Sequence, residues 1–420
     1  MSDHQSQCDS LLAQLEEHLS KSRYNPSVVG QYLGAARDFL DYLGKRHVPI
    51  GDVQSSDVTT YLRFGLQQFI RRNGQAPSSV AHWRASRTGG IHQLLRLVNG
   101  HWPQRAASRS PEGVLSQTFC AEYMQWLIER RGMAPATISG HAAEARQFLS
   151  WYGERESIDA FPLIGIAGID AYLQARAPSL RRVTRKTVAQ RLQCFLRFAF
   201  ATGRTEHDFA PSVLMPTLFA LESIPSALKA EEIRAVLQTT AADPSPKGLR
   251  DYAILQLLAT YGLRAGEITQ LQLNDIDWRA DRFCVRHTKS KAQSFLPLLP
   301  AVGDSLLAYL RRGRPTTEAR EIFIRMHAPY RGFERGSCLY SLIRRRIEAA
   351  GVEPAGKRGP HTLRHARAVS LLRSGTPPKI IGDVLGHRST VSTTPYLKLA
   401  TEDLRGVALE VPSRIGEVQL

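Results

Sequence analysis

Residues 361–365 read HTLRH and residues 385–396 read LGHRSTVSTTPY, and these two segments decide the fold of the chain. A third segment, YGLRAGE, lies upstream at residues 261–267. Together they place two arginines, two histidines and one tyrosine in the last part of the chain: Arg264, His361, Arg364, His387 and Tyr396. Such a set can hold a phosphodiester and attack it with a phenol oxygen.

The chemistry of strand cleavage explains why these residue types belong together. The planar fork of an arginine bonds two nonbridging phosphate oxygens at once and keeps its charge. A tyrosine, whose pKa is about 10, attacks phosphorus only if its proton has somewhere to go. The resulting phosphotyrosyl bond retains the energy needed for rejoining, so neither ATP nor a metal ion is required. The set therefore indicates an enzyme that cuts and rejoins DNA.

The three segments resemble the three motif boxes of the tyrosine recombinase (phage integrase) family. They occur in the family's order, and Tyr396 follows His387 by the family's usual nine positions. The resemblance covers roughly residues 115–410 and implies that Arg264 and Arg364 clamp the scissile phosphate. It further implies that Tyr396 attacks and becomes linked to the 3′ phosphate.

The resemblance also assigns roles to the remaining candidates. His361 is expected to accept or shuttle the tyrosine proton, and His387 to donate to a nonbridging oxygen. Lys289 matches the family's general acid for the 5′ oxygen, and Lys291 is its rival for that role. No cofactor or metal is implied.

Three neighbours of these residues are given supporting roles. Glu267 is expected to buttress Arg264 or its helix, with a plain surface salt bridge as the alternative. His365 is expected to pack or to cap a helix. Pro395 departs slightly from the commoner residue before the tyrosine and biases the preceding residue towards extended geometry.

The composition favours a polyanionic partner. The 420 residues contain 55 Lys+Arg against 38 Asp+Glu, which gives a net charge of +17. This excess fits nucleic acid, although a merely soluble basic protein is the alternative. Five scattered cysteines without a Cys-x-x-Cys pair suggest reduced thiols. No signal peptide or membrane span is predicted, so we expect a cytoplasmic protein at the bacterial nucleoid.

The first 205 residues follow a helical pattern that repeats. Asn25 and Pro26 can cap and begin a helix, and the same apolar spacing returns after Pro135, at an offset of 109 residues. This predicts a diverged duplication of a four-helix unit, at roughly 8–101 and 115–203. Chance similarity of two amphipathic bundles is the alternative.

Two stretches read as boundaries between domains. Residues 102–113 are polar and rich in turn residues, which is typical of a linker. Residues 206–226 carry three prolines but also Val213, Leu214, Leu218 and Phe219, so this stretch is expected to pack while it connects. The predicted domains are 1–105, an extra helical unit; 114–205, a core-binding unit; and 226–420, a catalytic domain with a C-terminal tail.

The region after residue 226 is mixed. Helices are predicted at about 248–261, after Arg264 and at about 379–385, and helices dominate again from Gly336. Residues 282–287 and 294–298 alternate like strands and form a basic hairpin. The predicted fold class is mainly α with a small antiparallel β-sheet in the catalytic domain. Two SAM-like four-helix domains would precede that domain.

Surface contacts to DNA are less readable from the sequence. Arg181, Arg182, Arg185 and Lys186 begin a predicted helix and could contact phosphates, with a solvated charge run as the alternative. Residues 344–346, three consecutive arginines, could touch the DNA backbone or simply be exposed.

The resemblance implies double-stranded DNA as partner and a tetramer on two DNA sites, which other recombinases of the same element could join. In such an assembly a C-terminal segment after about residue 402 would dock on a neighbouring protomer. The extra N-terminal unit suggests a mobile-element enzyme of integration or transposition. Two other functions remain: a topoisomerase-like or end-resolving enzyme with the same tyrosine chemistry, and a catalytically silent architectural DNA-binding protein.

Overall fold

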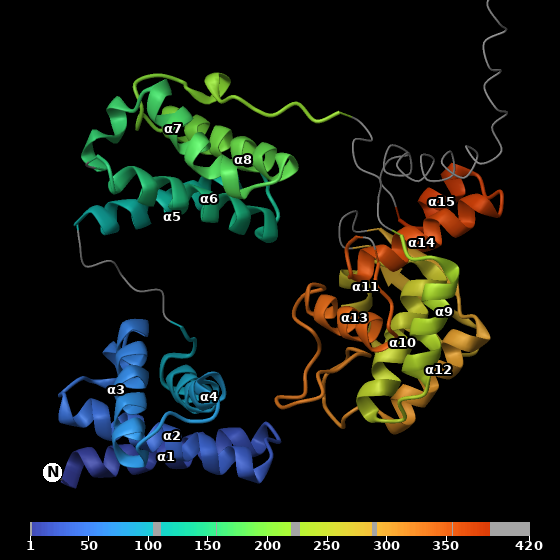
Figure 1. The fold of residues 1–420 in the computed structure, drawn as a ribbon, viewed down its shortest axis with the longest axis horizontal. Coiled ribbons are helices and arrows are strands. Elements are labelled where there is room, and N and C mark those ends of the chain that lie inside the picture. Colours follow the sequence, from blue (N-terminus) through green and yellow to red (C-terminus); the bar gives the residue numbers. More distant parts are fainter. Residues whose placement is uncertain are drawn as a thin grey trace, which may run out of the picture. The chain divides into compact units, whose positions relative to one another are not determined.

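The computed structural model describes residues 2–103, 111–156, 158–219, 227–287, 292–354 and 356–386. Helices dominate these residues, and one three-stranded antiparallel sheet accompanies them, as Figure 1 shows. The predicted fold class, mainly α with a small antiparallel sheet, is confirmed. Across these ranges no helix combines the length and the apolar character that a membrane span needs.

The first four helices pack around two apolar clusters of their own. These helices are α1 (Ser2–Lys21), α2 (Pro26–Lys45), α3 (Ser55–Asn73) and α4 (Val80–Asn99), with a 3-10 turn η1 (Ile50–Asp52) after α2. The predicted start of α2 is confirmed, because the Asn25 side chain accepts a hydrogen bond from the Ser27 amide at 2.9 Å. Phe39 and Leu40 of α2 are buried in these clusters together with Leu94 and Leu95 of α4.

The predicted linker between the helical units is shorter than the sequence suggests. The prediction places Trp102 in the linker, but this residue is buried in the cluster that holds Phe39 and Tyr61. At the other end, helix α5 already begins at Pro111. An aromatic side chain at the end of a polar stretch reaches back to the core because burial of its large apolar surface is favourable.

The next four helices surround a single aromatic-rich cluster. They are α5 (Pro111–Glu129), α6 (Pro135–Gly153), α7 (Ile166–Arg176) and α8 (Arg182–Ala201), with 3-10 turns η2 (Ile158–Leu163), η3 (Ala177–Ser179) and η4 (Ala210–Ser212). The predicted apolar face of α8 is buried, from Val188 to Ala199. By contact density, Pro103–Glu222 forms a compact unit of its own, and Met1–Trp102 is grouped with Ser223–Leu420.

The apolar stretch after α8 packs only in part. Val213 is buried, as expected, but Leu214 is 73% exposed and Phe219 is 65% exposed. Phe219 lies beneath the Arg182 guanidinium, whose Cζ atom is 5.6 Å from the ring centroid. The expectation that the whole stretch packs is therefore wrong for these two residues.

The C-terminal part is a helical core with a sheet at its side. Its helices are α9 (Ala230–Ala241), α10 (Pro246–Tyr261), α11 (Ala265–Thr269), α12 (Pro300–Arg312), α13 (Cys338–Ala349), α14 (Pro360–Arg373) and α15 (Pro378–Val384), with a 3-10 turn η5 (Leu273–Asp275). Helix α10 is buried along most of its length and packs against α9, α12 and α14. It is therefore the central helix of this part.

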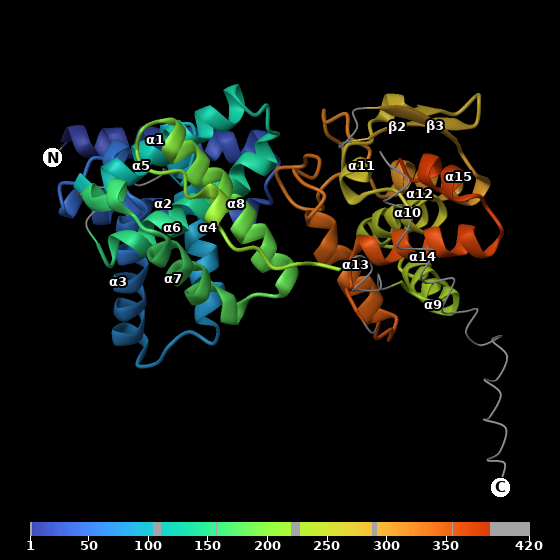
Figure 2. The same cartoon turned by 90° about the horizontal axis from the view of Figure 1, so that it is seen from above.

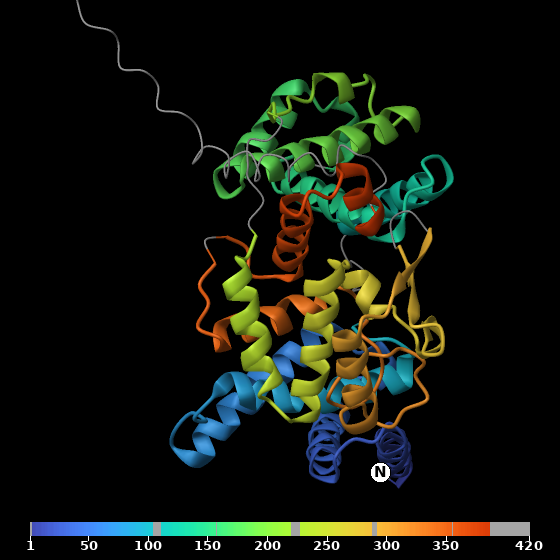
Figure 3. The same ribbon diagram turned by 90° about the vertical axis from the view of Figure 1, so that its right-hand side faces the viewer.

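The sheet consists of β1 (Ile276–Asp277), β2 (Arg282–Arg286) and β3 (Gln293–Pro297), in that order. The predicted hairpin is confirmed, with Arg282 opposite Pro297 and Arg286 opposite Gln293. Phe283 and Val285 alternate with exposed neighbours and bury one face of β2 against the helical core. Figure 2 shows β2 and β3 side by side next to this core, and Figure 3 shows the same strands in gold from another side.

Candidate active site

The segment 261–267 turns sharply between two helices and presents Arg264. Helix α10 ends at Tyr261, and Gly262 has a φ of 66°, a left-handed conformation that favours glycine. Arg264 is then the N-cap of α11. Its backbone amide donates to Oε2 of Glu267 at 2.8 Å, and its Nη1 donates to Oε1 at 2.8 Å.

Glu267 holds Arg264 in place from inside the protein. Its side chain is fully buried, whereas the Arg264 side chain keeps 17% of its surface exposed. The predicted buttress is confirmed, and the alternative of a surface salt bridge is wrong. Since a buried charge is costly unless it is paired and hydrogen-bonded, this carboxylate fixes the guanidinium.

Arg364 lies on α14 and is almost completely buried. Its Nη1 donates to the carbonyl oxygen of Gly262 at 2.7 Å, and its Nη2 donates to the carbonyl oxygen of Leu385 at 2.6 Å. Carbonyl oxygens carry no net charge, so these contacts orient the guanidinium and leave its positive charge in place. Arg364 thus ties the turn after α10 to the end of α15.

The two predicted arginines converge on neighbouring backbone atoms. Nη2 of Arg264 donates to the carbonyl oxygen of Gly386 at 2.9 Å, next to the Leu385 oxygen that Arg364 contacts. The first two segments therefore meet in space with Leu385 and Gly386, the described start of the third, although the arginines are a hundred positions apart. Both fixed guanidiniums lie at the chain segment that leads into His387.

His287 completes this cluster and was not predicted. It follows β2, is buried, and lies with Nδ1 2.9 Å from Oε1 of Glu267 and Nε2 2.9 Å from Oγ of Ser294. Gly386 packs against its ring so closely that a Cβ there would lie 2.4 Å from the ring. No motif signals this histidine; only its place at the end of a predicted strand could have drawn attention to it.

The two histidines of the second segment differ in their surroundings. His361 is exposed at the start of α14, and its ring lies 6.2 Å from that of His365, nearly parallel to it. Burial lowers the pKa of His365 to about 4, and the nearby positive charges of His361 and Arg364 add to the effect. His365 is therefore neutral near pH 7, in agreement with the expectation that it packs.

Comparison with known proteins shows the family of this chain. Residues 226–403 match the phage integrase family. The chain is 35% identical over 385 residues to the integrase/recombinase y4rA of Sinorhizobium fredii (strain NBRC 101917 / NGR234), an alignment that covers 91% of this chain and 89% of the relative. The chain belongs to the phage integrase family. Members of this family are tyrosine recombinases, enzymes that cleave and rejoin DNA strands.

Other relatives agree with this assignment. This tyrosine recombinase is 58% identical over 189 residues to the integrase/recombinase y4gC of the same organism, which covers 45% of this chain and 97% of the relative. Its fold resembles that of a lambda integrase dimer bound to a core site, with a TM-score of 0.53 and 17% identity. That match covers 71% of this chain and 99% of the other.

Several predicted site residues of the recombinase lie outside the described residues. They are Lys289, Lys291, His387 and Tyr396, as well as Pro395 and the C-terminal segment after residue 402. Their roles stay predictions. Of the six predicted catalytic residues, the structure describes Arg264, His361 and Arg364.

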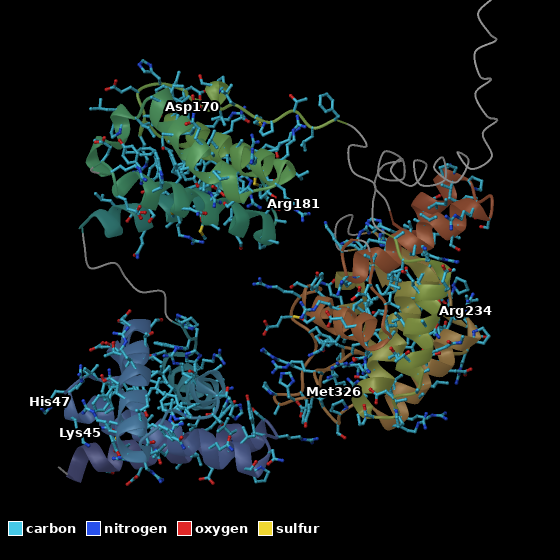
Figure 4. All side chains as sticks on the ribbon, viewed as in Figure 1. Lys45, His47, Asp170, Arg181, Arg234 and Met326 are labelled. Carbon is cyan, nitrogen blue, oxygen red and sulfur yellow. The ribbon has the colours of Figure 1, made fainter. Side chains whose placement is uncertain are left out.

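The predicted DNA-contacting residues of the recombinase lie at the start of α8. Arg181 is its N-cap and is exposed, as are Arg182 and Arg185, while Lys186 is half-buried; Figure 4 labels Arg181 at this end of the helix. Nε of Arg185 donates to the carbonyl oxygen of Leu180 at 2.9 Å. Contact with DNA from this surface remains a prediction.

The arginine run at 344–346 has a different role from the one expected. Arg346 is mostly buried, and it bonds Oδ2 of Asp251 at 2.9 Å and Oδ2 of Asp243 at 2.8 Å. Arg344 is exposed and pairs with Glu348 one turn further along α13. The expectation of DNA contact or simple exposure is wrong for Arg346, which links α13 to α10 and to the end of α9.

Proposed function

We propose that this recombinase is a site-specific integrase of a mobile element. It cleaves double-stranded DNA with Tyr396, forms a 3′-phosphotyrosyl intermediate and rejoins the strands without metal or ATP. The observation that carries the proposal is the convergence of Arg264 and Arg364 on adjacent carbonyl oxygens, those of Gly386 and Leu385.

Arg264 and Arg364 are proposed to clamp the scissile phosphate and to stabilise the charge that develops on it. Fixed donors aimed at developing charge lower the barrier because they need no reorganisation during the reaction. Glu267 supplies that rigidity for Arg264, and the carbonyl oxygens of Gly262 and Leu385 supply it for Arg364.

The remaining roles concern protons. His361 lies one helical turn before Arg364 on α14, so both residues lie on one side of that helix. It is proposed to take up the proton of Tyr396, while His387 donates to a nonbridging oxygen. Lys289 is proposed to protonate the leaving 5′ oxygen, with Lys291 as its rival.

The assembly is proposed to contain four protomers on two duplex sites, together with other recombinases of the element. Residues 114–205 would form the core-binding domain, with phosphate contacts from Arg181, Arg182, Arg185 and Lys186. Residues 226–420 would form the catalytic domain, and the protein would act at the bacterial nucleoid. The chain's formal charge of +17 supports a polyanionic partner.

A nicked suicide duplex, built from the ends of the element that carries the gene, tests the reaction. After cleavage the short strand diffuses away, so a protein–DNA adduct accumulates and can be followed on a denaturing gel. We expect the adduct with the native protein and none with Tyr396→Phe, which should bind the same duplex with unchanged affinity. An adduct that persists in Tyr396→Phe would show that another residue is the nucleophile.

The same assay separates the rival functions. Recombinant products from two paired sites identify a recombinase, whereas relaxation of any supercoiled plasmid identifies a topoisomerase-like enzyme. Binding to the element ends with no adduct from the native protein would leave an architectural DNA-binding protein.

A further inference from the structure

The first four-helix unit (α1–α4) contains a ladder of a cation and three aromatic rings. The Arg46 guanidinium carbon lies 5.0 Å from the centroid of the Tyr42 ring. Tyr42 and Tyr61 meet edge to face at 5.1 Å and 62°, and Tyr61 meets Phe39 at 5.1 Å and 69°. The ladder thus connects α2 to α3 and ends at an arginine.

The second four-helix unit (α5–α8) contains the same ladder at corresponding positions. Arg155 lies 4.4 Å from the centroid of the Trp151 ring, Trp151 meets Tyr172 at 5.4 Å and 66°, and Tyr172 meets Phe148 at 4.9 Å and 66°. The three members on and just after α6 follow those on and just after α2 by the offset of 109 residues. Four matching members with matching geometry support a duplication over chance similarity.

The distribution of charge repeats as well. In the first unit six of the eight acidic residues lie in residues 2–45, and Asp52 and Asp57 follow them; in the second unit four lie in residues 111–153 and four in residues 154–170. Residues 171–205 then contain eight basic residues and no Asp or Glu, and residues 58–103 contain six arginines and no Asp or Glu. The later part of each unit is therefore basic in sequence, although Asp38 and Asp41 of α2 line the same hollow as Arg72 and Arg87.

The arginines of α3 and α4 are available to a ligand. Arg63, Arg71, Arg72 and Arg84 are exposed, and within the described residues none of them forms an ion pair. Positively charged side chains that lie near one another without carboxylate partners repel each other. Binding of a polyanion removes this repulsion. Phosphates of nucleic acid release condensed counter-ions when arginines replace them, and this release drives binding.

We propose that α3 and α4 form a second DNA-binding surface, which contacts the phosphate backbone of duplex DNA in addition to the contacts made by the second unit. The proposal rests on the proposed function, because it takes duplex DNA as the substrate. Arg71 and Arg84 flank the turn between the two helices, so they lie at the same end of this surface. The occupant is the duplex that flanks the cleaved site, which offers the same phosphates as the segment contacted by the second unit; a separate DNA segment is an outcome of the test.

The test measures how binding depends on salt in the full-length protein. The double variant Arg71→Gln/Arg84→Gln is titrated with fluorescent duplex over a range of KCl concentrations. The slope of log K against log[KCl] should become shallower by about 0.9 for each phosphate that the variant no longer neutralises. Lys21→Gln/Arg37→Gln is the matched control, because it removes the same charge from exposed positions on α1 and α2 of the same unit. Its slope should equal that of the native protein.

Two DNA designs distinguish the sources of the phosphates. Lengthening the cleaved duplex by about one helical turn, 10 base pairs, on each side tests the flank, and a second short duplex added in trans tests the separate segment. If Arg71→Gln/Arg84→Gln matches the native protein on every duplex, or if both double variants show the same reduction in slope, the proposal is wrong. Adduct formation by the control variant Lys21→Gln/Arg37→Gln on saturating short suicide duplex should stay unchanged, so a failure of cleavage itself is recognised separately.

Discussion

The Nδ1 atom of His287 lies 2.9 Å from Oε1 of Glu267, the same oxygen that accepts a hydrogen bond from Nη1 of Arg264. Because a carboxylate only accepts, Nδ1 carries the proton. In the neutral ring Nε2 then accepts from the hydroxyl of Ser294 on β3. His287 therefore orients the carboxylate that orients Arg264, and it links this pair to the β2–β3 hairpin.

Substitution of His287 should slow cleavage without weakening DNA binding. His287→Ala removes a hydrogen bond to a charged group, worth about 1.5–3 kcal/mol, so adduct formation should slow by about tenfold or more. His287→Asn keeps an amide donor near the position of Nδ1 and should retain most of the rate. His287→Gln places its amide nearer Nε2 and should behave like alanine. Equal rates for the asparagine and glutamine variants would contradict this role of Nδ1.

Gly386 is expected to tolerate no side chain. Its φ of 62° costs an alanine about 1–2 kcal/mol, and the added Cβ would also meet the His287 ring. Gly375→Ala is the control, because Gly375 has a φ of 79° with open space around it. Chemical denaturation should show a larger loss of unfolding free energy for Gly386→Ala, together with slower adduct formation. Equal losses would mean that the close approach to His287 does not matter.

Arg346 should be a structural residue and not a DNA contact. Arg346→Ala removes one of the two arginines that bond the buried Asp251 and leaves the other, Arg250, so the free energy of unfolding should fall by about 1.5–3 kcal/mol. Arg344→Ala removes an exposed pair and should change it by about 0.5 kcal/mol or less. Urea denaturation measures both, and the salt dependence of DNA binding should be the same for the two variants. If the salt dependence of DNA binding became weaker in Arg346→Ala but not in Arg344→Ala, Arg346 would be a DNA contact after all.

The half-buried position of His365 should make stability depend on pH. Its pKa is lowered to about 4 in the folded protein and is about 6.5 in an unfolded chain. Between these values the unfolded chain binds a proton that the folded chain does not, so the folded state loses stability as the pH falls from about 6.5 to 4. Thermal unfolding at pH 7 and pH 5 should show a smaller decrease in Tm for His365→Asn than for the native protein. The positive groups that face His365 are His361, Arg364 and Lys357.

Local signals in the sequence predicted the elements well. The Asn25–Pro26 start of α2 depends on one side-chain cap, and the β2–β3 hairpin depends on alternation within a few residues. Arg264 and Glu267 are three positions apart, so their contact follows from helix geometry. The prediction that Arg264 and Arg364 lie close together came from the resemblance to the family, because their spacing in the sequence does not determine it.

Contacts between residues that are far apart in the chain could not be predicted from the sequence. His287 belongs to no motif, and its importance depends on Glu267, twenty positions earlier, and on the close approach of Gly386. Arg346 looked like part of a basic run, because Asp251 and Asp243 lie about a hundred positions away. Trp102 begins a polar stretch, and Phe39 and Tyr61 of its cluster lie 63 and 41 positions earlier in the sequence.

The attachment of both arginines to the last turn before His387 has a consequence for protein synthesis. Arg264 and Arg364 are translated well before Leu385 and Gly386, whose carbonyl oxygens hold them. A nascent chain, or one cut short by a premature stop codon before Leu385, lacks these two acceptors, so each guanidinium keeps only its Nη1 contact, to Glu267 or to the Gly262 carbonyl oxygen. The complete set of contacts around the two arginines is therefore assembled only after nearly the whole polypeptide has left the ribosome.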